Sequence, residues 1–371
     1  MVAGGVGSKW NNAAVLSQPR VMLVIADSSR TGGPEHVFTL ARQLLAASWT
    51  PLVVCPEGPL QARCAEAGIA QLPLIMSGTG LAAAPIRLRQ MVRHHDIDLV
   101  HSHALRAGMV LRRARVPTPF VHTHHLDGWF TAGRLRTRLH RREFRRLAAS
   151  ADRQIAVSAA VMDFLRDEVG LDPAPLRLVA NGIDPLRARP RSTPAGFRVG
   201  TLARLTSAKG IDLAVMALAA PAGRTLSLQV GGTGPELAAL IDLAASLGVA
   251  DRVHFLGDVV DRQQFFEGCD VVWVPSREEP FGLVACEAMS AGVPVVASRV
   301  GGLPEIVDAP NAGILVSPAN PAALASVTAA LLADPERYGR LSLAGPERVL
   351  KHFSAQRMAA LTRGVYREVL R

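Results

Sequence analysis

The stretch VMLVIADSSRTGGPEHVFTLARQLLAA, residues 21–47, decides the fold. Its first part, VMLVIA, is an unbroken apolar run, which predicts a strand buried on both faces. A turn rich in glycine follows at residues 31–34, and apolar residues then recur at helical spacing from Glu35 onward. The stretch therefore predicts one strand–loop–helix unit, with Gly33 in the loop that follows the strand.

The same alternation recurs along the chain. Further strands are predicted at 51–55, 98–103, 119–124, 153–158, 198–203, 226–232, 252–257, 270–276, 292–298 and 312–317. Helical segments lie between most of them, a pattern typical of doubly wound parallel sheets. We predict an α/β protein with a lead-in (1–20), an N-terminal domain (21–183), a proline- and arginine-rich linker (184–197), a C-terminal domain (198–353) and a terminal helix free to pack across either domain (354–371).

Composition excludes several classes of protein. Of 371 residues, 49% are apolar and 19% charged, which is incompatible with disorder over most of the chain. Apolar runs are too short to span a bilayer, and the N-terminus lacks a secretory signal, so we expect a cytoplasmic protein. The cysteines have no C-x-x-C spacing, which argues against a zinc knuckle or a disulfide framework: Cys55, Cys64, Cys269 and Cys286.

Positive charge is concentrated in the first domain. Residues 1–180 contain 22 basic and 13 acidic side chains, against 19 and 18 in the remainder. This asymmetry predicts an anionic partner for the first domain: a phosphate, an acidic lipid or a nucleic acid.

One candidate site follows the strand predicted at 270–276. Glu279 lies in the loop, and Pro280 to Gly282 are predicted to open a helix that carries Glu287. Backbone N–H groups at a helix opening, flanked by two carboxylates, suit sugar and ribose hydroxyls. The alternative is that Glu279 is an ordinary helix N-terminal charge and Glu287 a solvated one.

A second candidate loop follows the strand predicted at 198–203. Arg204 and Lys209 on one loop could clamp a diphosphate, whose charge grows as its bond to a sugar breaks. The chain has 38 arginines but only three lysines, so a lysine here is not a default choice. The alternative is a pair of solvated surface charges.

These motifs together resemble the retaining glycosyltransferases of family 4, which have the GT-B architecture of two facing Rossmann-like domains. The resemblance covers Val21 to Arg371. The E-x7-E motif of this family matches Glu279 and Glu287. Its R-x4-K-G motif matches Arg204, Lys209 and Gly210. Supporting matches are G-G-x-E at 32–35, N-G-I-D at 181–184, G-x-G-P at 232–235 and A-G-V-P-V-V-A at 291–297.

The resemblance implies roles for individual residues. Arg204, Lys209 and Gly33 would bind the donor diphosphate, and Glu287 the ribose. Glu279 would bind the donor sugar, together with the backbone of Phe281, Gly282 and Leu283. The base would lie against Phe255, Leu256 and Gly257. A histidine at a strand end, His125 or His103, would contact the donor sugar or the acceptor, and the choice between the two stays open.

The histidines have two other interpretations, as core residues or as metal ligands. Strand alternation places His101 and His122 inside, as core residues. H-S-H at 101–103 could hold a metal, but no carboxylate follows in the H-x-H-x-D-H manner, so we predict no metal site. The pair Asp96 and Asp98 precedes a strand, at the wrong edge of a sheet for ligands.

An arginine-rich segment spans residues 133–147. As a helix it would place Arg134, Arg138, Arg141, Arg142 and Arg145 on one face and leucines on the other, including Leu139 and Leu147. One interpretation is docking on anionic lipid, at the inner face of the plasma membrane, to reach a lipid-linked acceptor. The other is a solvated helix. Nucleic acid is not predicted, because no binding motif accompanies the charge.

The sequence therefore predicts a metal-independent enzyme without cofactor that moves a hexose from a nucleoside-diphosphate sugar to an acceptor hydroxyl with retention. The enzyme is predicted to act in the synthesis of cell-envelope or lipid-linked glycans, which would supply its acceptor. Alternatives are a small soluble acceptor, a nucleotide-sugar epimerase of the same architecture, or a catalytically silent nucleotide-sugar binding protein. A dehydrogenase is disfavoured because Leu237 stands where the last glycine of G-x-G-x-x-G belongs.

Overall fold

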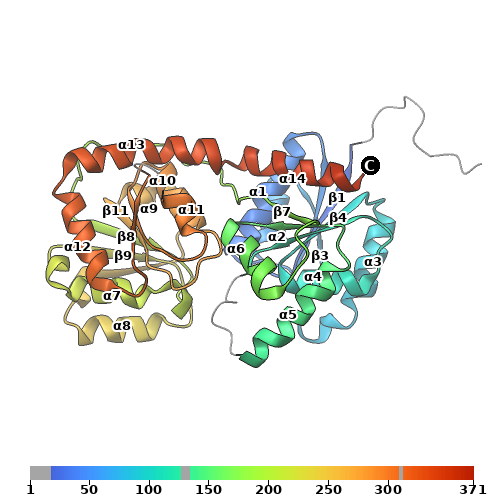
Figure 1. The fold of residues 1–371 in the computed structure, drawn as a ribbon, viewed down its shortest axis with the longest axis horizontal. Helices are drawn as coiled ribbons and strands as arrows, with labels where there is room; N and C mark the ends of the chain where they lie inside the picture. Colours follow the sequence, from blue (N-terminus) through green and yellow to red (C-terminus); the bar gives the residue numbers. More distant parts are fainter. Residues whose placement is uncertain (1–17, 127–133, 309–311) are drawn as a thin grey trace, which may run out of the picture.

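The computed structural model describes residues 18–126, 134–308 and 312–371, with the side chains of 134–138 outside the description. The predicted lead-in therefore lies almost wholly outside the described residues. Two lobes lie side by side, each a sheet covered by helices on both faces (Figure 1).

The first lobe is built on a parallel sheet. Its described strands follow the order β3 (Ala70–Pro73), β2 (Thr50–Cys55), β1 (Arg20–Ile25), β4 (Leu99–His103), β5 (Phe120–His124), β6 (Arg153–Ala156) and β7 (Leu176–Leu178). Helices α1 (Gly32–Ala46), α2 (Pro59–Glu66), α3 (Ala84–His94), α4 (Ala104–Ala114), α5 (Arg134–Ala148) and α6 (Ala159–Asp163) connect them. Val21 to Val24 are fully buried, which explains the unbroken apolar run.

The second lobe has the same winding. Its described strands follow the order β10 (Val253–Gly257), β9 (Ser227–Gly231), β8 (Arg198–Leu202), β11 (Val271–Val274), β12 (Val295–Ser298) and β13 (Ile314–Val316). Its helices are α7 (Ile211–Ala219), α8 (Leu237–Ser246), α9 (Arg262–Glu267), α10 (Leu283–Ser290), α11 (Leu303–Val307), α12 (Pro321–Leu332) and α13 (Pro335–His352).

The predicted fold class is confirmed: both sheets are parallel and doubly wound. Two strands were not predicted, β3 and β7. Both are short, and both end the sheet. Apart from the buried Leu176, their residues are half-exposed or exposed and form no buried apolar run. An edge strand needs less apolar surface, so the sequence pattern that marks it is weak.

The terminal helix α14 (Ala355–Val369) crosses from the second lobe to the first, where it packs beside α1 (Figure 1). Tyr366 is fully buried there, and its hydroxyl is hydrogen-bonded at 2.7 Å to His101 Nδ1 in β4. Glu368 accepts hydrogen bonds from Arg153 and Arg177, which holds its pKa down at about 2. The helix thus completes the core of the first lobe.

Two chain segments pass side by side between the lobes. The N–H of Ile183 donates to the carbonyl of Phe353 at 2.9 Å, and the N–H of Ala355 donates to that of Ile183 at 2.7 Å. A Cβ at Gly182 would lie 2.4 Å from the Ser354 carbonyl oxygen, so only glycine permits this approach. The segment 184–197 then follows the second lobe, where Arg191 and the Ala195 N–H bind the buried Asp270.

Candidate functional site

The predicted site loops all follow carboxyl ends of strands, and the two lobes meet there. Ser158, after β6, donates a hydrogen bond of 2.6 Å to the carbonyl of Pro280, after β11. The carboxylate of Glu305 in α11 accepts from the N–H groups of Ala159 and Ala160, which open α6. These contacts join the loops of one lobe to those of the other.

Lys209 and Glu279 lie together at the edge of the second sheet. Lys209 Nζ donates to Glu279 Oε2 at 3.0 Å, and Ser276 Oγ donates to the same oxygen at 3.2 Å. Both charged side chains are largely buried. Arg204, on the same loop as Lys209, is exposed and forms no ion pair with any residue that the structure describes. The loop after β8 therefore offers one cation held by a carboxylate and one exposed to solvent.

Two glycines bring these loops together. Gly210 has φ +64°, and a Cβ there would lie 2.2 Å from the Pro275 carbonyl oxygen. Gly301 has φ +51°, and its Cβ would lie 2.0 Å from the carbonyl oxygen of Glu279. Any side chain at either position would push the Lys209 or the Glu279 loop away from its neighbour.

Helix α10 begins at Leu283, three residues later than the predicted opening at Pro280. Gly282 has φ 120° and precedes the first helical residue, Leu283, so Pro280 and Phe281 belong to the loop. The unpaired N–H groups of the first turn lie at this point, as at any helix N-terminus. Across from them is the glycine turn of the first lobe: a Cβ on Gly32 would be 3.5 Å from Leu283 Cδ1. Gly33, predicted in a loop, is already in the first turn of α1.

Glu287 is neither solvated nor unpartnered. It is buried in α10 and accepts a hydrogen bond from Arg262 at the start of α9. Arg262 also comes within 3.9 Å of Glu35 in α1, and Glu35 accepts from Arg63 at 2.5 Å. Burial raises the pKa of the Glu287 carboxyl above its usual value, and the charge of Glu35 adds to this, whereas Arg262 opposes it. The alternative of a solvated helix face for Glu287 is therefore wrong.

The segment predicted to line a base forms the end of β10. Phe255 and Gly257 are partly buried, and Leu256 is 49% exposed. The carbonyl of Gly257 accepts from the N–H of Gly232 at 2.7 Å, which ties this strand end to the G-x-G-P turn. An apolar surface thus lies beside the glycine turn at the same sheet edge.

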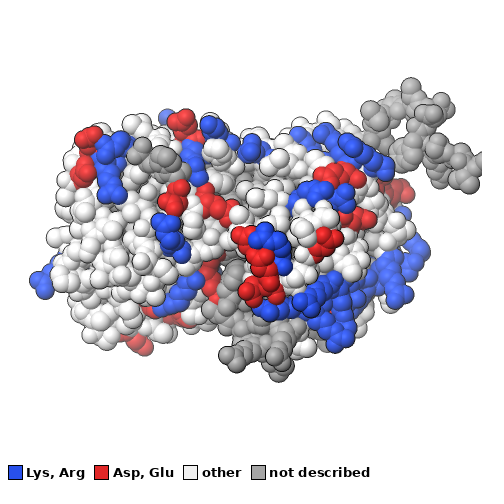
Figure 2. All heavy atoms as spheres, in the orientation of Figure 1, with Lys and Arg blue, Asp and Glu red and all other residues white. Residues whose placement is uncertain are grey.

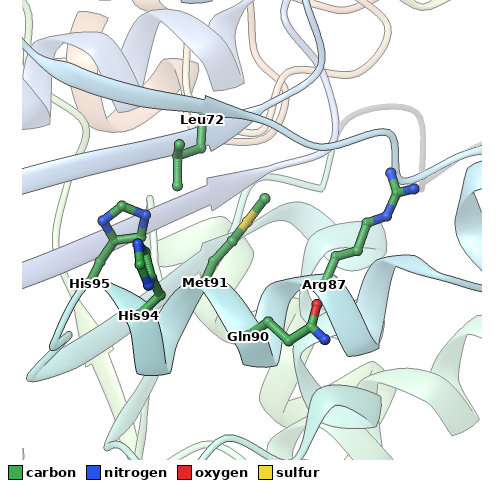
Figure 3. A pocket seen from close by; sticks show the side chains of 6 residues that line it. All are labelled: Leu72, Arg87, Gln90, Met91, His94 and His95. Atoms are coloured by element: carbon green, nitrogen blue, oxygen red, sulfur yellow. The ribbon is translucent and has the colours of Figure 1, made fainter.

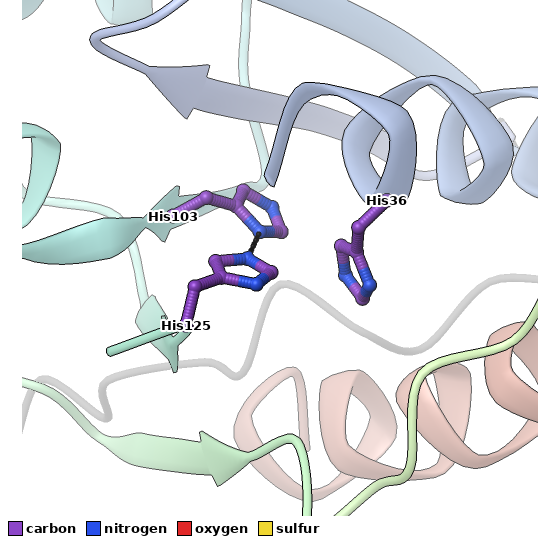
Figure 4. A group of neighbouring side chains, drawn as sticks. All are labelled: His36, His103 and His125. Atoms are coloured by element: carbon purple, nitrogen blue, oxygen red, sulfur yellow. Dashed lines mark hydrogen bonds between the residues drawn. The ribbon is translucent and has the colours of Figure 1, made fainter. Parts of the chain in front are cut away.

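The histidines divide into two groups. His101 has both ring nitrogens hydrogen-bonded, to Tyr366 and Thr123. His122 and His124 have one each, to Ser102 and to Gln154, and all three are buried core residues. His103 and His125 lie together instead, with His103 Nδ1 3.3 Å from His125 Nε2. His36, from the first helix, joins them and completes a group whose nitrogens lie within 4.8 Å of one another (Figure 4).

Burial lowers the pKa of all six of these imidazoles below its usual value. Burial lowers the pKa of His36 to about 4, partly opposed by the neighbouring Asn181 amide. Burial also lowers the pKa of His103 and His125 well below the usual value, and the neighbouring imidazoles lower it further. Both predicted histidines therefore reach the same place, and the third member was not predicted.

The basic helix α5 is partly neutralised within the chain. Arg141 donates to Glu168, and Arg145 donates to the carbonyl of Val169. Arg142 is exposed. The side chains of Arg134 and Arg138 lie outside the described residues. Of the leucines predicted on the face opposite the arginines, Leu147 is buried, whereas Leu139 is 59% exposed.

The basic surface extends beyond this helix. Figure 2 shows Lys and Arg side chains gathered on the first lobe, over α3, α4 and α5. Arg106, Arg113 and Arg115, in and after α4, are exposed. No helix within the described ranges is both long and apolar enough to cross a bilayer.

A separate hollow of about 370 Å³ lies between α3 and β3 (Figure 3). It is lined by Leu72, Arg87, Gln90, Met91, His94 and His95. None of the residues predicted for the site lines it.

Reasoning from sequence missed Arg262, His36, Ser158 and Glu305. Glu35 was noted within the G-G-x-E match but without a role. Arg262 has no local signal, because its partners come from α10 and from the other lobe. His36 could have been found from its place one turn inside a helix that begins at the glycine turn.

The amino-acid sequence matches two family models that meet near residue 186. Residues 30–187 match "Glycosyltransferase Family 4", and residues 185–348 match "Glycosyl transferases group 1". The chain belongs to glycosyltransferase family 4. Over 306 residues it is 35% identical to D-inositol 3-phosphate glycosyltransferase of Rhodococcus opacus, an alignment that covers 73% of this chain and 68% of that one.

Two further relatives are similar at this level. Glycogen synthase of Mycobacterium tuberculosis H37Rv is 32% identical, with 78% of this chain and 73% of that one covered. D-inositol 3-phosphate glycosyltransferase of Salinispora tropica is 33% identical over 74% of this chain, which spans 64% of that protein's length.

Solved glycosyltransferase structures share the fold of this family 4 member. Anabaena HepE in complex with UDP and glucose superposes with a TM-score of 0.82 at 22% identity, covering 95% of this chain and all of that one. Sucrose-phosphate synthase from Thermosynechococcus elongatus superposes with a TM-score of 0.81 at 23% identity, covering 95% and 99%. The two-lobed GT-B architecture is thereby established.

Proposed function

We propose that this family 4 glycosyltransferase transfers a hexose from a nucleoside-diphosphate sugar to an acceptor hydroxyl, with retention and without a required metal. The observation that supports this most is the arrangement of Lys209, Glu279 and Glu287 around the first turn of α10, opposite Gly32 of the other lobe. A diphosphate needs a cation and helix N–H groups, and a sugar needs carboxylates. HepE binds UDP and glucose according to its structure, which suggests the same donor class.

Each proposed group has one task. Lys209 and Arg204 take the charge that develops on the leaving diphosphate, and Gly33 leaves room for it beside the first lobe. Glu279 releases Lys209 to the phosphate and binds sugar hydroxyls, together with the backbone at Phe281, Gly282 and Leu283. Glu287 binds the ribose, and the base lies against Phe255, Leu256 and Gly257. His125, with His103 beside it, faces the donor sugar or the acceptor.

Retention would follow if the diphosphate leaves from, and the acceptor hydroxyl attacks, the same face of the sugar. A double displacement needs a carboxylate beside the anomeric carbon, and Glu279 is held by Lys209 and Ser276 as a positioning group. The phosphate oxygen then takes the acceptor proton as the diphosphate leaves. Movement of the lobes about the 184–197 segment would exclude water that hydrolyses the donor.

The acceptor is proposed to be anionic or carried on an anionic lipid, because the first lobe carries the excess of positive charge. The basic surface over α3, α4 and α5 would then dock on the membrane that holds a lipid-linked acceptor. A small soluble acceptor is the second candidate. It is favoured by the relatives named for an inositol phosphate.

The proposal is tested by following each donor by proton NMR in EDTA. UDP-glucose, GDP-mannose and ADP-glucose are offered with water alone, then with an inositol phosphate, glycogen or a polyprenyl phosphate. We expect one donor to release a sugar or product whose first-formed anomer keeps the α configuration. Release of the β anomer first would contradict retention. Release only with added magnesium would contradict metal independence, and a stable donor in every mixture would contradict transfer.

A further inference from the structure

The side chains of His36, His103 and His125 lie together, and the proposed function gives the three no joint role. The three side chains come from separate elements, since His36 lies in α1, His103 ends β4 and His125 directly follows β5 (Figure 4). All three are at least 95% buried. The sheet order makes this meeting inevitable, because β1, which leads into α1, pairs with β4, and β4 pairs with β5.

The spacing of the nitrogens fits a metal ion. His103 Nδ1 and His125 Nε2 are 3.3 Å apart. Two nitrogens bound to one tetrahedral zinc at about 2.1 Å are separated by about 3.4 Å. One nitrogen of His36 lies within 4.8 Å of both, so its ring would have to move closer to complete a three-histidine site.

The polar atoms of the group are only partly satisfied, because the one hydrogen bond within it joins His103 Nδ1 and His125 Nε2. Within the described residues, neither ring nitrogen of His36 has a hydrogen bond of normal geometry, nor has His103 Nε2. Buried polar atoms without a partner are costly and uncommon. A metal would use a lone pair of His36 that has no partner in the part of the chain that the structure describes, and would replace the hydrogen bond between His103 and His125.

The surroundings hold the group in place. The ring of His101 packs on that of His103 with centroids 4.1 Å apart, and His101 is itself anchored by Tyr366 and Thr123. Three imidazoles suit Zn²⁺ and leave a fourth position for water or an oxygen of a ligand.

We propose that His36, His103 and His125 form a binding site for a transition-metal dication of the Zn²⁺ class. The site goes beyond the proposed function and is not a cofactor site for it. If His125 faces the donor sugar or the acceptor, as proposed above, bound Zn²⁺ would hold its imidazole away from that ligand. Zinc would then inhibit transfer, which proceeds in EDTA.

The site is tested by equilibrium binding of Zn²⁺ to the untagged protein after removal of metals, in competition with a chromogenic chelator. We expect one tight Zn²⁺ per chain, and a Co²⁺ complex with the intense visible absorption of tetrahedral coordination. His36→Gln should weaken Zn²⁺ binding at least tenfold. His103→Gln should do the same, so that the result does not depend on one variant folding.

The control is His94→Gln. His94 is exposed, and its ring lies 5.0 Å from that of His95, so this surface pair is the competing zinc ligand to exclude. The control should bind Zn²⁺ like the wild type. Failure of the wild type to bind Zn²⁺, or unchanged binding in His36→Gln, would overturn the site. These outcomes are independent of activity, so they separate failure of the site from failure of the proposed transfer reaction.

Discussion

The guanidinium of Arg262, in the second lobe, lies 3.9 Å from the carboxylate of Glu35, in the first, while it also binds Glu287. One side chain therefore connects α1 to the helix that carries the proposed ribose ligand. Glu35 is held in turn by Arg63. In this arrangement Arg262 neutralises Glu287, so a ribose that binds Glu287 must share it with Arg262 or displace it.

Replacing Arg262 with Met should destabilise the protein. Glu287 would keep its buried charge and lose its cation, at a cost of about 3 kcal/mol. Removing both charges, in Arg262→Met with Glu287→Gln, should recover much of that loss. Urea unfolding of the wild type, both single variants and the double variant measures the coupling. Additive effects would show that the pair does not interact.

The same carboxyl predicts a pH dependence. Because burial raises the pKa of Glu287, the stability that its protonated form provides is present at low pH and is lost as pH rises through the folded-state value. The melting temperature of Glu287→Gln, minus that of the wild type, should therefore become more positive from pH 4 to pH 7. A difference that stays constant across this range would contradict the raised pKa.

The buried histidines predict the opposite slope. The pKa of His36 and of His124 is lowered to about 4, so the unfolded chain binds more protons than the folded one between about pH 4 and 6.5. Each such shift corresponds to about 3 kcal/mol. The melting temperature should fall steeply as pH drops from 7 to 5. His124→Gln should flatten the curve, and the exposed His94→Gln should leave it unchanged.

Removing the Tyr366 hydroxyl should loosen the terminal helix. Tyr366→Phe leaves His101 Nδ1 without its partner in a buried position, which costs about 1–3 kcal/mol. In Tyr366→Phe, the rate of amide hydrogen exchange in α14, measured by mass spectrometry, should rise. Tyr338→Phe is the control, because that buried hydroxyl binds the Asp270 carbonyl in the second lobe. Equal protection of α14 in both variants would show that the His101 contact contributes nothing.

Much of this architecture could be predicted from sequence, for a physical reason. Strands such as VVWV in β11 are buried on both faces and appear as plain apolar runs. The Lys209–Glu279 pair was within reach because both residues follow strands, and carboxyl ends of parallel strands share one edge. The contact between Arg262 and Glu35 could not be predicted from sequence. It depends on the angle at which the two lobes meet, and no local pattern encodes that angle.

Lys209 should be essential to transfer. Lys209→Met removes the cation that stabilises the leaving diphosphate and should lower kcat by roughly 10²–10³-fold. Lys351→Met is the matched control, because Lys351 is exposed in the second lobe. Its kcat should equal that of the wild type. Similar rates in Lys209→Met and the wild type would remove Lys209 from the proposed mechanism.

The basic surface predicts binding to acidic vesicles. Arg134→Ser, Arg138→Ser and Arg142→Ser together spare Arg141 and Arg145, which hold internal contacts. At about 1 kcal/mol for each arginine near an anionic surface, binding to phosphatidylserine vesicles should weaken about 100-fold. The control changes three exposed arginines elsewhere, Arg224, Arg337 and Arg367. Equal vesicle binding by both triple variants would contradict docking through α5.

The most direct test of the central proposal is a thermal-shift series with UDP, GDP, ADP and NAD, each in EDTA and in magnesium, on the wild type and Lys209→Met. We predict that one nucleoside diphosphate raises the melting temperature of the wild type equally in both conditions, that NAD does not, and that Lys209→Met reduces the shift. A shift that requires magnesium, or the same shift in Lys209→Met, would contradict a metal-independent donor site built on Lys209.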